Sequence, residues 1–83
     1  MIKIENQELN SYKSKLKRIR VSSGLTQDDL AKLSGINIKS ISAYEQDPYK
    51  INKASVDTLF ILSESLNCNM EDLIEKNLIN KGD

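Results

Sequence analysis

Apolar residues along this chain recur every three or four positions, which is the spacing of one face of an α-helix. Tyr12, Leu16 and Ile19 form the first such set, so a helix is predicted from Ser11 to a stop at Gly24. Glycine often ends a helix because it adopts a positive φ at no steric cost. The first predicted element is therefore a short amphipathic helix.

A second and a third helix are predicted on either side of Gly35. Thr26, with Asp29 three residues later, has the pattern of a capping box, so the second helix should begin after Thr26. The residues of this helix expected on its inner face are Leu30, Ala31 and Leu33. Asn37 is a suitable N-cap for the third helix. The residues of the third helix expected to point inward are Ile41 and Tyr44.

Two further helices are predicted in the second half of the chain. Residues 46–54 are expected to form a loop, because Pro48 disfavours a helical conformation in the residue before it. Ser55 is a good cap for the fourth helix, which carries Val56, Leu59, Leu62 and Leu66. Asn69, with Asp72 three residues on, opens a short fifth helix that bears Leu73 and Ile74. Five short helices with tight links predict an all-α bundle.

Composition narrows the possible functions. The chain contains no His, which is the usual general base and the commonest metal ligand, and it has no Gly-rich phosphate loop. We therefore expect no enzymatic activity, no catalytic residue, no metal site and no cofactor. Cys68 is the single cysteine and is expected to fill core space, which suits a reducing cytoplasm. The N-terminus lacks the apolar region of a signal peptide, and the longest apolar run is too short to span a membrane.

Charge is distributed unevenly although the formal net charge is zero. Residues 1–50 contain nine Lys and Arg against six acidic residues, whereas residues 51–83 contain three Lys against six acids. The N-terminal side is therefore the side that favours a polyanion such as nucleic acid.

The spacing around Gly35 is that of two helices joined by a tight turn. The small side chain of Ala31 permits a close approach of the helices, and Gly35 accepts the positive φ of a sharp reversal. On a helical wheel, the face opposite Ile41 and Tyr44 has short side chains and one cation, a surface that fits a groove. This outer face consists of Lys39, Ser42, Ala43 and Gln46, with Ile38 at its edge. Any helical hairpin also needs Gly and Ala, so a purely structural interpretation of those two residues stays open.

The stretch LKRIRVSSGLTQDDLAKLSGINIKSISAYE resembles the Cro/CI-type helix-turn-helix domains of the XRE family, which includes the phage lambda repressor. The residues in register are Leu16, Arg20, Gly24, Leu25, Thr26, Gln27, Leu30, Ala31, Gly35, Ile41, Tyr44 and Glu45. The resemblance implies a five-helix lambda-repressor-like domain over residues 11–80, between an N-terminal arm (1–10) and a tail (81–83). It also implies a transcriptional regulator, a repressor rather than an activator, that binds double-stranded DNA in a sequence-specific manner.

The resemblance also assigns roles to individual residues. Gln27 would contact a phosphate and brace the third helix, and Arg20 with Glu45 would form an internal salt bridge. The residues nearest the bases and backbone would be Asn37, Ile38, Lys39, Ser40, Ser42 and Ala43, in the helix at about 38–46. Lys39 has the chemistry to bind guanine and Asn37 to pair with adenine. Tyr49, Lys50 and Lys53 are candidate phosphate contacts.

The chain departs from the family pattern at several positions. Ile38 and Ala43 are often polar or basic there; here they can touch thymine methyl groups but donate no hydrogen bond. The segment after Glu45 is longer, Asp47 stands near the usual glycine, and Ser63 replaces a core alanine. Two questions stay open. Phe60 and Ile61 are either core residues or a homodimer patch. The chain is either a regulator, an antitoxin-like module with a toxin or other protein partner, or a version without DNA binding.

Overall fold

A computed structural model of the chain describes residues 14–75. In chain order, its elements are α2 (Lys15–Ser22), α3 (Gln27–Ser34), α4 (Ile38–Gln46), the 3-10 helix η1 (Pro48–Lys53), α5 (Val56–Leu66) and the 3-10 helix η2 (Met70–Asp72). No strand occurs within residues 14–75, and the predicted all-α class is confirmed. The expected arm and tail, residues 1–10 and 81–83, lie outside the described part.

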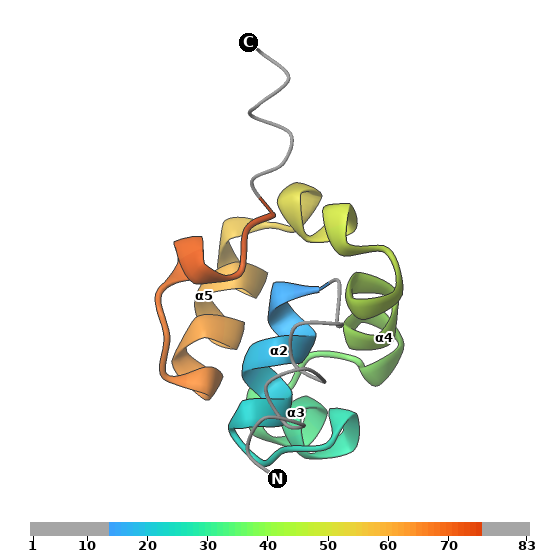
Figure 1. The fold of residues 1–83 in the computed structure, drawn as a ribbon, viewed down its shortest axis with the longest axis vertical. Coiled ribbons are helices and arrows are strands. Elements are labelled where there is room, and N and C mark those ends of the chain that lie inside the picture. Colours follow the sequence, from blue (N-terminus) through green and yellow to red (C-terminus); the bar gives the residue numbers. More distant parts are fainter. Residues whose placement is uncertain (1–13, 76–83) are drawn as a thin grey trace, which may run out of the picture.

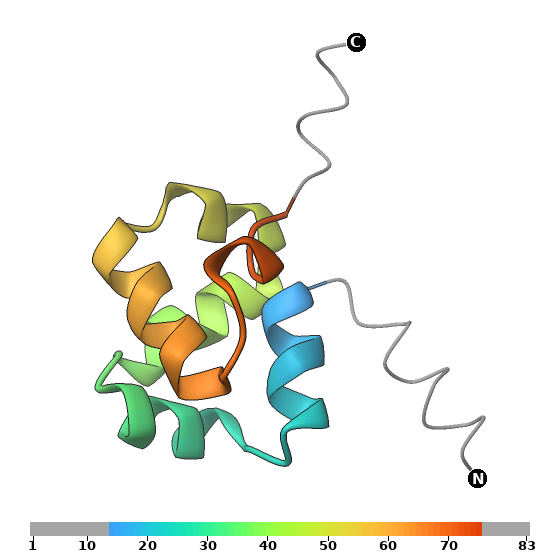
Figure 2. The same cartoon turned by 90° about the vertical axis from the view of Figure 1, so that its left-hand side faces the viewer.

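The other helices are arranged around α2. In Figure 1, α2 lies at the centre, α3 below it, and α4 and α5 on opposite sides. The view turned by 90° brings α5 to the front and keeps α3 at the bottom (Figure 2). In both views η1 lies at the end of the bundle opposite α3, directly after α4 in the chain. The arrangement therefore places α4 and η1 next to each other along one side.

Every helix contributes to one small core. The buried apolar residues are Leu16, Leu30, Ile41, Ile51, Leu59, Leu62, Leu66 and Leu73. Each of these side chains stabilises the fold by roughly 1.5–3 kcal/mol relative to an exposed position. Seven of the eight fall on apolar periodicities that are visible in the sequence; the exception is Ile51, which lies in the segment expected to be a loop.

The first helix begins later than the sequence pattern indicates. Ser14 is the N-cap of α2, with an extended backbone (φ −91°, ψ 128°), and its side chain accepts a hydrogen bond from the Lys17 N–H at 3.0 Å. The predicted start at Ser11 is therefore wrong, because the cap sits three residues further on. Tyr12, expected on the inner face, lies outside the described residues. The predicted stop is confirmed: Ser23 is the C-cap and Gly24 follows with φ +78°.

Two apolar side chains that fit the helical spacing point to solvent: Leu33, which is expected on the inner face of its helix, and Val56, which the fourth predicted helix carries. Leu33 is 59% exposed and Val56 is 68% exposed. The covered face of α3 runs through Leu30 and Ala31, and Leu33 lies roughly a third of a turn away from its middle. Val56 is the first residue of α5 and lies to one side of the buried row formed by Leu59, Leu62 and Leu66. Helical spacing alone did not distinguish these edge positions from the core.

The expected loop after α4 is largely a 3-10 helix. Asp47 ends α4 with a non-helical backbone (φ −125°, ψ 87°), and Pro48 occupies the first position of η1. Proline suits this position because its fixed φ matches a helix start and no partner is needed for the missing N–H. Since the φ of Asp47 is negative, the absence of the family's glycine at this point costs nothing. Ile51, which is 1% exposed, attaches η1 to the core.

The last helical element is a single 3-10 turn, shorter than the expected fifth helix. Asn69 and Asp72 form the capping box that their spacing suggested, with the Asn69 N–H donating to Asp72 Oδ2 at 2.9 Å. Backbone bonds of the i to i+3 type follow, from Asp72 N to Asn69 O and from Leu73 N to Met70 O, both at 3.0 Å. The turn delivers Leu73, fully buried, into the core.

Two polar side chains on the α5 side of the core are accommodated locally. Ser63 is buried, and its hydroxyl donates to the Phe60 carbonyl oxygen at 2.8 Å, so it replaces an alanine without leaving an unpaired group. Cys68 packs against the core and is partly buried, as expected. Burial raises the pKa of the Cys68 thiol, and the charge of Asp72 raises it further. This thiol is therefore less reactive at neutral pH than a free cysteine.

A polar clasp closes the domain at Glu75. The Asn52 amide binds the Glu75 backbone twice at 2.9 Å: Nδ2 donates to the Glu75 carbonyl oxygen, and Oδ1 accepts from its N–H. The Glu75 carboxylate in turn accepts the Lys15 N–H at 2.8 Å, which satisfies a free donor at the start of α2. These bonds connect η1, the segment after η2 and α2.

The turn between α3 and α4 depends on a left-handed residue. Gly35 has φ +79°, and its N–H donates to the Ala31 carbonyl oxygen at 2.8 Å. A Cβ added at this position would meet no atom within 4 Å. The glycine is therefore needed for its backbone conformation and not for a close approach of the two helices.

We predict that substitutions of Gly35 rank by their tolerance of positive φ and not by their size. Gly35→Ala should lower the free energy of unfolding by about 1–2 kcal/mol. Gly35→Asn should cost less, because asparagine visits the left-handed region more readily. Urea unfolding followed by circular dichroism measures both. A larger loss for Asn than for Ala would show that space limits the position.

Candidate nucleic-acid interface

Both helices of the α3–α4 pair are capped by side chains. The Thr26 hydroxyl accepts the Asp29 N–H, and Asp29 Oδ2 accepts the Thr26 N–H, each at 2.9 Å. These bonds to Thr26, and to a smaller extent Lys32, lower the pKa of Asp29. At the start of α4, Asn37 Oδ1 accepts the Lys39 N–H at 2.7 Å. The two caps predicted from the sequence are confirmed, and they fix where each helix starts.

The inner face of α4 is buried as the wheel predicted. Ile41 is fully buried, and Tyr44 packs against the core from the edge. On the outer side, Lys39 and Gln46 are exposed, Ser40, Ser42 and Ala43 are half-buried, and Ile38 is 39% exposed. The Gln46 amide reaches back to the Ser42 hydroxyl at 3.4 Å. The outer face of α4 therefore consists mainly of short side chains, and Lys39 is its cation.

The rotation of α4 is fixed by a buried ion pair with α2. Arg20 Nε lies 2.6 Å from Glu45 Oε2, and Arg20 Nη2 donates to Glu45 Oε1 at 2.9 Å. The two side chains are only 9% and 3% exposed. These two parallel hydrogen bonds from one guanidinium to one carboxylate define both the distance and the angle between α2 and α4. The salt bridge implied by the family resemblance is thus present in the structure.

Two further bonds extend this pair to the start of α3. Arg20 Nη1 donates to the Leu25 carbonyl oxygen at 2.7 Å, and Gln27 Nε2 donates to Glu45 Oε1 at 2.9 Å. Gln27 therefore braces α4, as the resemblance implied. The amide nitrogen of Gln27 carries a second hydrogen, which is the group suited to a phosphate oxygen.

The capping role of Asn37 limits how it can contact a base. A bidentate contact with adenine requires both the carbonyl oxygen and the amide nitrogen of asparagine. The oxygen of Asn37 already accepts the Lys39 N–H. The amide nitrogen is the atom left to donate, and it fits an acceptor on a base edge or a phosphate oxygen.

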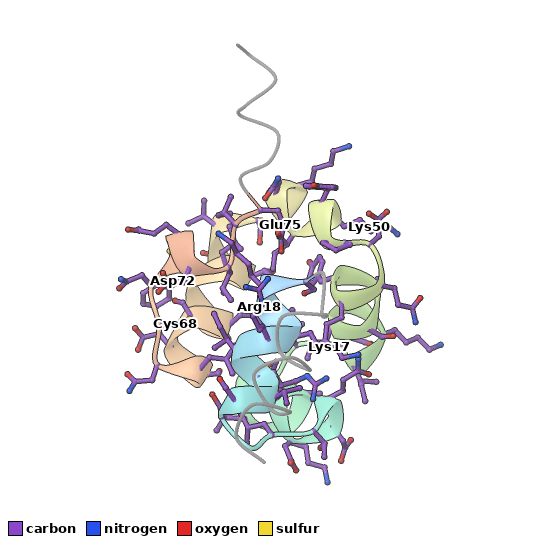
Figure 3. All side chains as sticks on the ribbon, in the orientation of Figure 1. Lys17, Arg18, Lys50, Cys68, Asp72 and Glu75 are labelled. Atoms are coloured by element: carbon purple, nitrogen blue, oxygen red, sulfur yellow. The ribbon has the colours of Figure 1, made fainter. Side chains whose placement is uncertain are left out.

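Three residues of η1 extend the surface beyond α4. Lys50 and Lys53 are exposed on η1, and Tyr49 is 40% exposed. Figure 3 shows Lys50 on the side of the molecule where α4 lies, opposite Cys68 and Asp72. Lys50 therefore lies on the same side of the molecule as α4. The clasp between Asn52 and Glu75 holds η1 in this place.

Several residues that support this surface have no recognisable pattern in the sequence. Asn52 and Glu75 lie 23 positions apart, Lys15 and Glu75 lie 60 apart, and neither pair belongs to a helical periodicity. The Leu25 carbonyl is a backbone atom whose partner depends on the tertiary fold. The side-chain types in the sequence identify none of these contacts.

Within residues 14–75, no three His, Cys, Asp or Glu side chains gather into a group that could hold a metal ion. None of the helices described is long and apolar enough to cross a membrane.

A helix-turn-helix family model matches residues 16–73, well over half of the chain. The matched range contains the α3–α4 pair and the Arg20–Glu45 bridge. The chain therefore belongs to the helix-turn-helix family, in its Cro/CI-type XRE branch, whose members are DNA-binding transcription regulators. No curated protein and no solved structure matches this chain significantly.

We predict that Arg20 and Glu45 are strongly coupled in stability. Arg20→Met or Glu45→Leu alone should each lower the free energy of unfolding by about 3–5 kcal/mol, because each leaves a buried charge without its partner. The double variant should lose much less than the sum of the two losses. Urea unfolding of the four proteins measures the coupling.

The exposed pair of Asp28 and Lys32 serves as the matched control. Its side chains are 61% and 77% exposed at a distance of 3.1 Å, so Asp28→Ala should cost less than about 1 kcal/mol. Additive losses in the buried pair would contradict the role assigned to it.

Proposed function

We propose that this protein is a cytoplasmic transcriptional repressor that binds double-stranded DNA by sequence and inserts α4 into the major groove. The observation that carries this proposal is the division of α4 into two faces. Its inner face is fixed by Ile41 and by Glu45, which is bound to Arg20 and Gln27. Its outer face has short side chains that let the helix backbone approach the base edges.

The outer residues suit distinct contacts. Lys39 fits guanine O6 or N7, while Ser42 fits a hydrogen bond to any base edge it reaches. Ile38 and Ala43 fit the methyl group of thymine. Because of these contacts, we expect the preferred sites to contain both guanine and thymine. The Ser42 hydroxyl has the Gln46 amide as its side-chain partner, and an amide cannot act as the general base that activates a nucleophile, so binding without catalysis is proposed.

Phosphate contacts are assigned to groups around this face. Gln27, the Asn37 amide nitrogen, Ser40 and Lys50 fit phosphate oxygens, and Lys53 and Tyr49 extend that set along η1. Such contacts set the register of a protein on the duplex and make affinity depend on salt. In this proposal the zero net charge of the chain is no obstacle, because Lys39 on α4 and Lys50 lie on the same side of the molecule.

A symmetric homodimer is proposed as the binding unit. Val56, Phe60 and Ile61 on α5 are 68%, 51% and 37% exposed, so neither Phe60 nor Ile61 is a core residue. The described part of the molecule measures 38 × 33 × 21 Å. Helix-turn-helix dimers bind two half-sites that lie one DNA turn, ~34–36 Å, apart. A second copy of this chain is the occupant that fits the apolar α5 surface.

We predict that Lys39→Ala weakens binding to the preferred duplex by about 1–3 kcal/mol, because a contact to guanine is lost. The duplex is first selected from a random pool, and fluorescence anisotropy then gives the affinity at several salt concentrations. The slope of affinity against salt should change by no more than about one phosphate contact.

Lys32→Ala is the matched control, since it removes an exposed lysine of α3 that pairs with Asp28. This variant should bind like the wild type. Equal affinity of the wild type for selected and random duplexes, or an affinity that does not fall as salt rises, would contradict the proposed function.

A separate prediction concerns the dimer. Phe60→Lys should weaken self-association, because it places a charge in the apolar α5 surface, while the fold stays intact since the side chain is already exposed. Sedimentation equilibrium measures the association and circular dichroism the fold. The dimer assignment fails if the wild type is monomeric both free and on a two-half-site duplex.

A further inference from the structure

Two positions on the outer face of α4 have side chains without a hydrogen-bonding group. Ile38, the first residue of the helix, is 39% exposed although its side chain is large and apolar. Ala43 is half-buried and offers a single methyl group. In the proposed mode of binding, Ile38 is therefore the apolar side chain of α4 with the greatest reach toward a base edge.

An apolar side chain in the major groove has one kind of partner. Among the groups that the base pairs present there, the C5-methyl group of thymine is apolar, and the others are hydrogen-bond donors or acceptors. 5-Methylcytosine carries the same methyl group on the same ring atom. The two bases differ at C4, where thymine has the O4 acceptor and cytosine has the N4 amino donor. A side chain that contacts only the methyl group therefore does not distinguish thymine from 5-methylcytosine.

The polar groups around Ile38 leave the methyl group as the means of recognition. Glu45 is the one acidic residue of α4; it is 8% exposed and bound to Arg20, so no carboxylate of this helix is free to accept from the N4 amino group of cytosine. The side-chain oxygen of Asn37 accepts the Lys39 N–H. In the proposed mode of binding, the Asn37 amide nitrogen contacts a phosphate and the Lys39 ammonium contacts a guanine. Unmethylated cytosine therefore gains nothing at this position, whereas 5-methylcytosine gains the contact with Ile38.

We propose that Ile38 reads the C5-methyl group of a pyrimidine and not the identity of the base, so that this protein binds 5-methylcytosine in place of thymine at one position of its site. Lys39, the next residue, fits the guanine that pairs with 5-methylcytosine or lies beside it. This assignment rests on the proposed function, and it adds DNA methylated at cytosine C5 to the ligands of the α4 surface. Methylation of a cytosine at this position would raise the affinity of the site.

The test uses the full chain and the duplex selected from a random pool. In synthetic copies of this duplex, each thymine is replaced in turn by uracil, which removes the methyl group alone, by cytosine, or by 5-methylcytosine, with guanine opposite the two cytosines. Fluorescence anisotropy at one salt concentration gives each affinity. At the position that Ile38 contacts, uracil should weaken binding about threefold to tenfold, as expected for the loss of one buried methyl group. Cytosine should weaken binding at least as much, and 5-methylcytosine should restore the affinity to within about twofold of thymine.

Ile38→Ser is the diagnostic variant. It removes the apolar contact, so its affinities for the thymine duplex and the uracil duplex should be equal, whereas Ile38→Val should keep the preference for the methyl group. Each result is a ratio of two affinities of one protein, so a loss of stability in a variant does not change it. Leu33→Ser is the matched control, because it removes an apolar side chain that is 59% exposed on α3, and it should keep the wild-type ratio.

Two kinds of negative result are distinguishable. If the wild type binds the selected duplex no better than a random one, the proposed function fails, and the role of Ile38 fails with it. The role of Ile38 alone is overturned if the wild type prefers the selected duplex but no thymine responds to uracil. It is also overturned if 5-methylcytosine binds no better than cytosine at the responsive position, or if Ile38→Ser keeps the wild-type ratio.

Discussion

The buried pair of Arg20 and Glu45 is the interaction on which the rest of this domain depends. Two charges withdrawn from water are tolerated only when nearly every hydrogen-bonding position around them is filled. Here Leu25 and Gln27 fill the remaining positions, so one network includes α2, the link to α3, the start of α3 and the last turn of α4. A rotation of α4 would break several of these bonds at once, and the network therefore selects one orientation out of the many that apolar contacts at Ile41 alone would permit.

This constraint separates structural from reading positions on α4. Because Ile41 and Glu45 hold the helix, the residues at 38, 39, 42 and 43 make few demands on the fold. Their side chains can differ from those of related domains without a cost in stability, which is how Ile38 and Ala43 are compatible with an otherwise regular helix-turn-helix. Family membership therefore establishes the scaffold and the general activity, whereas in the proposed mode of binding the preferred bases depend on these few outer side chains.

The accuracy of the sequence-based predictions follows the range of the interactions involved. Caps such as Thr26 with Asp29, and core residues such as Leu30 and Leu62, depend on neighbours within about one helical turn, so periodicity and spacing identified them. Leu33 and Val56 have the same periodicity but lie at the margins of their helices, where the packing of other elements decides exposure.

The 3-10 helix η1 was missed because Pro48 was interpreted only as a helix breaker. The contacts of Asn52 with Glu75 were not predictable, since they join residues that only the complete fold brings together. The pairing of Arg20 with Glu45, 25 positions apart, was found through family resemblance and not through local pattern.

The two parts of the proposed interface, α4 and η1, are both attached to α2. Glu45 fixes α4 to Arg20 in the second half of α2, while the Asn52–Glu75 clasp fixes η1 to the Lys15 N–H at the beginning of the same helix. If α4 contacts the bases of a duplex and η1 contacts its phosphates, the distance between α4 and η1 must stay constant. The elements α4 and η1 also pack directly against each other, and Ile51 attaches η1 to the core. The two polar anchors add to this packing by attaching both elements to the same helix. The geometry of the proposed DNA-binding surface is thus determined in part by a helix outside that surface.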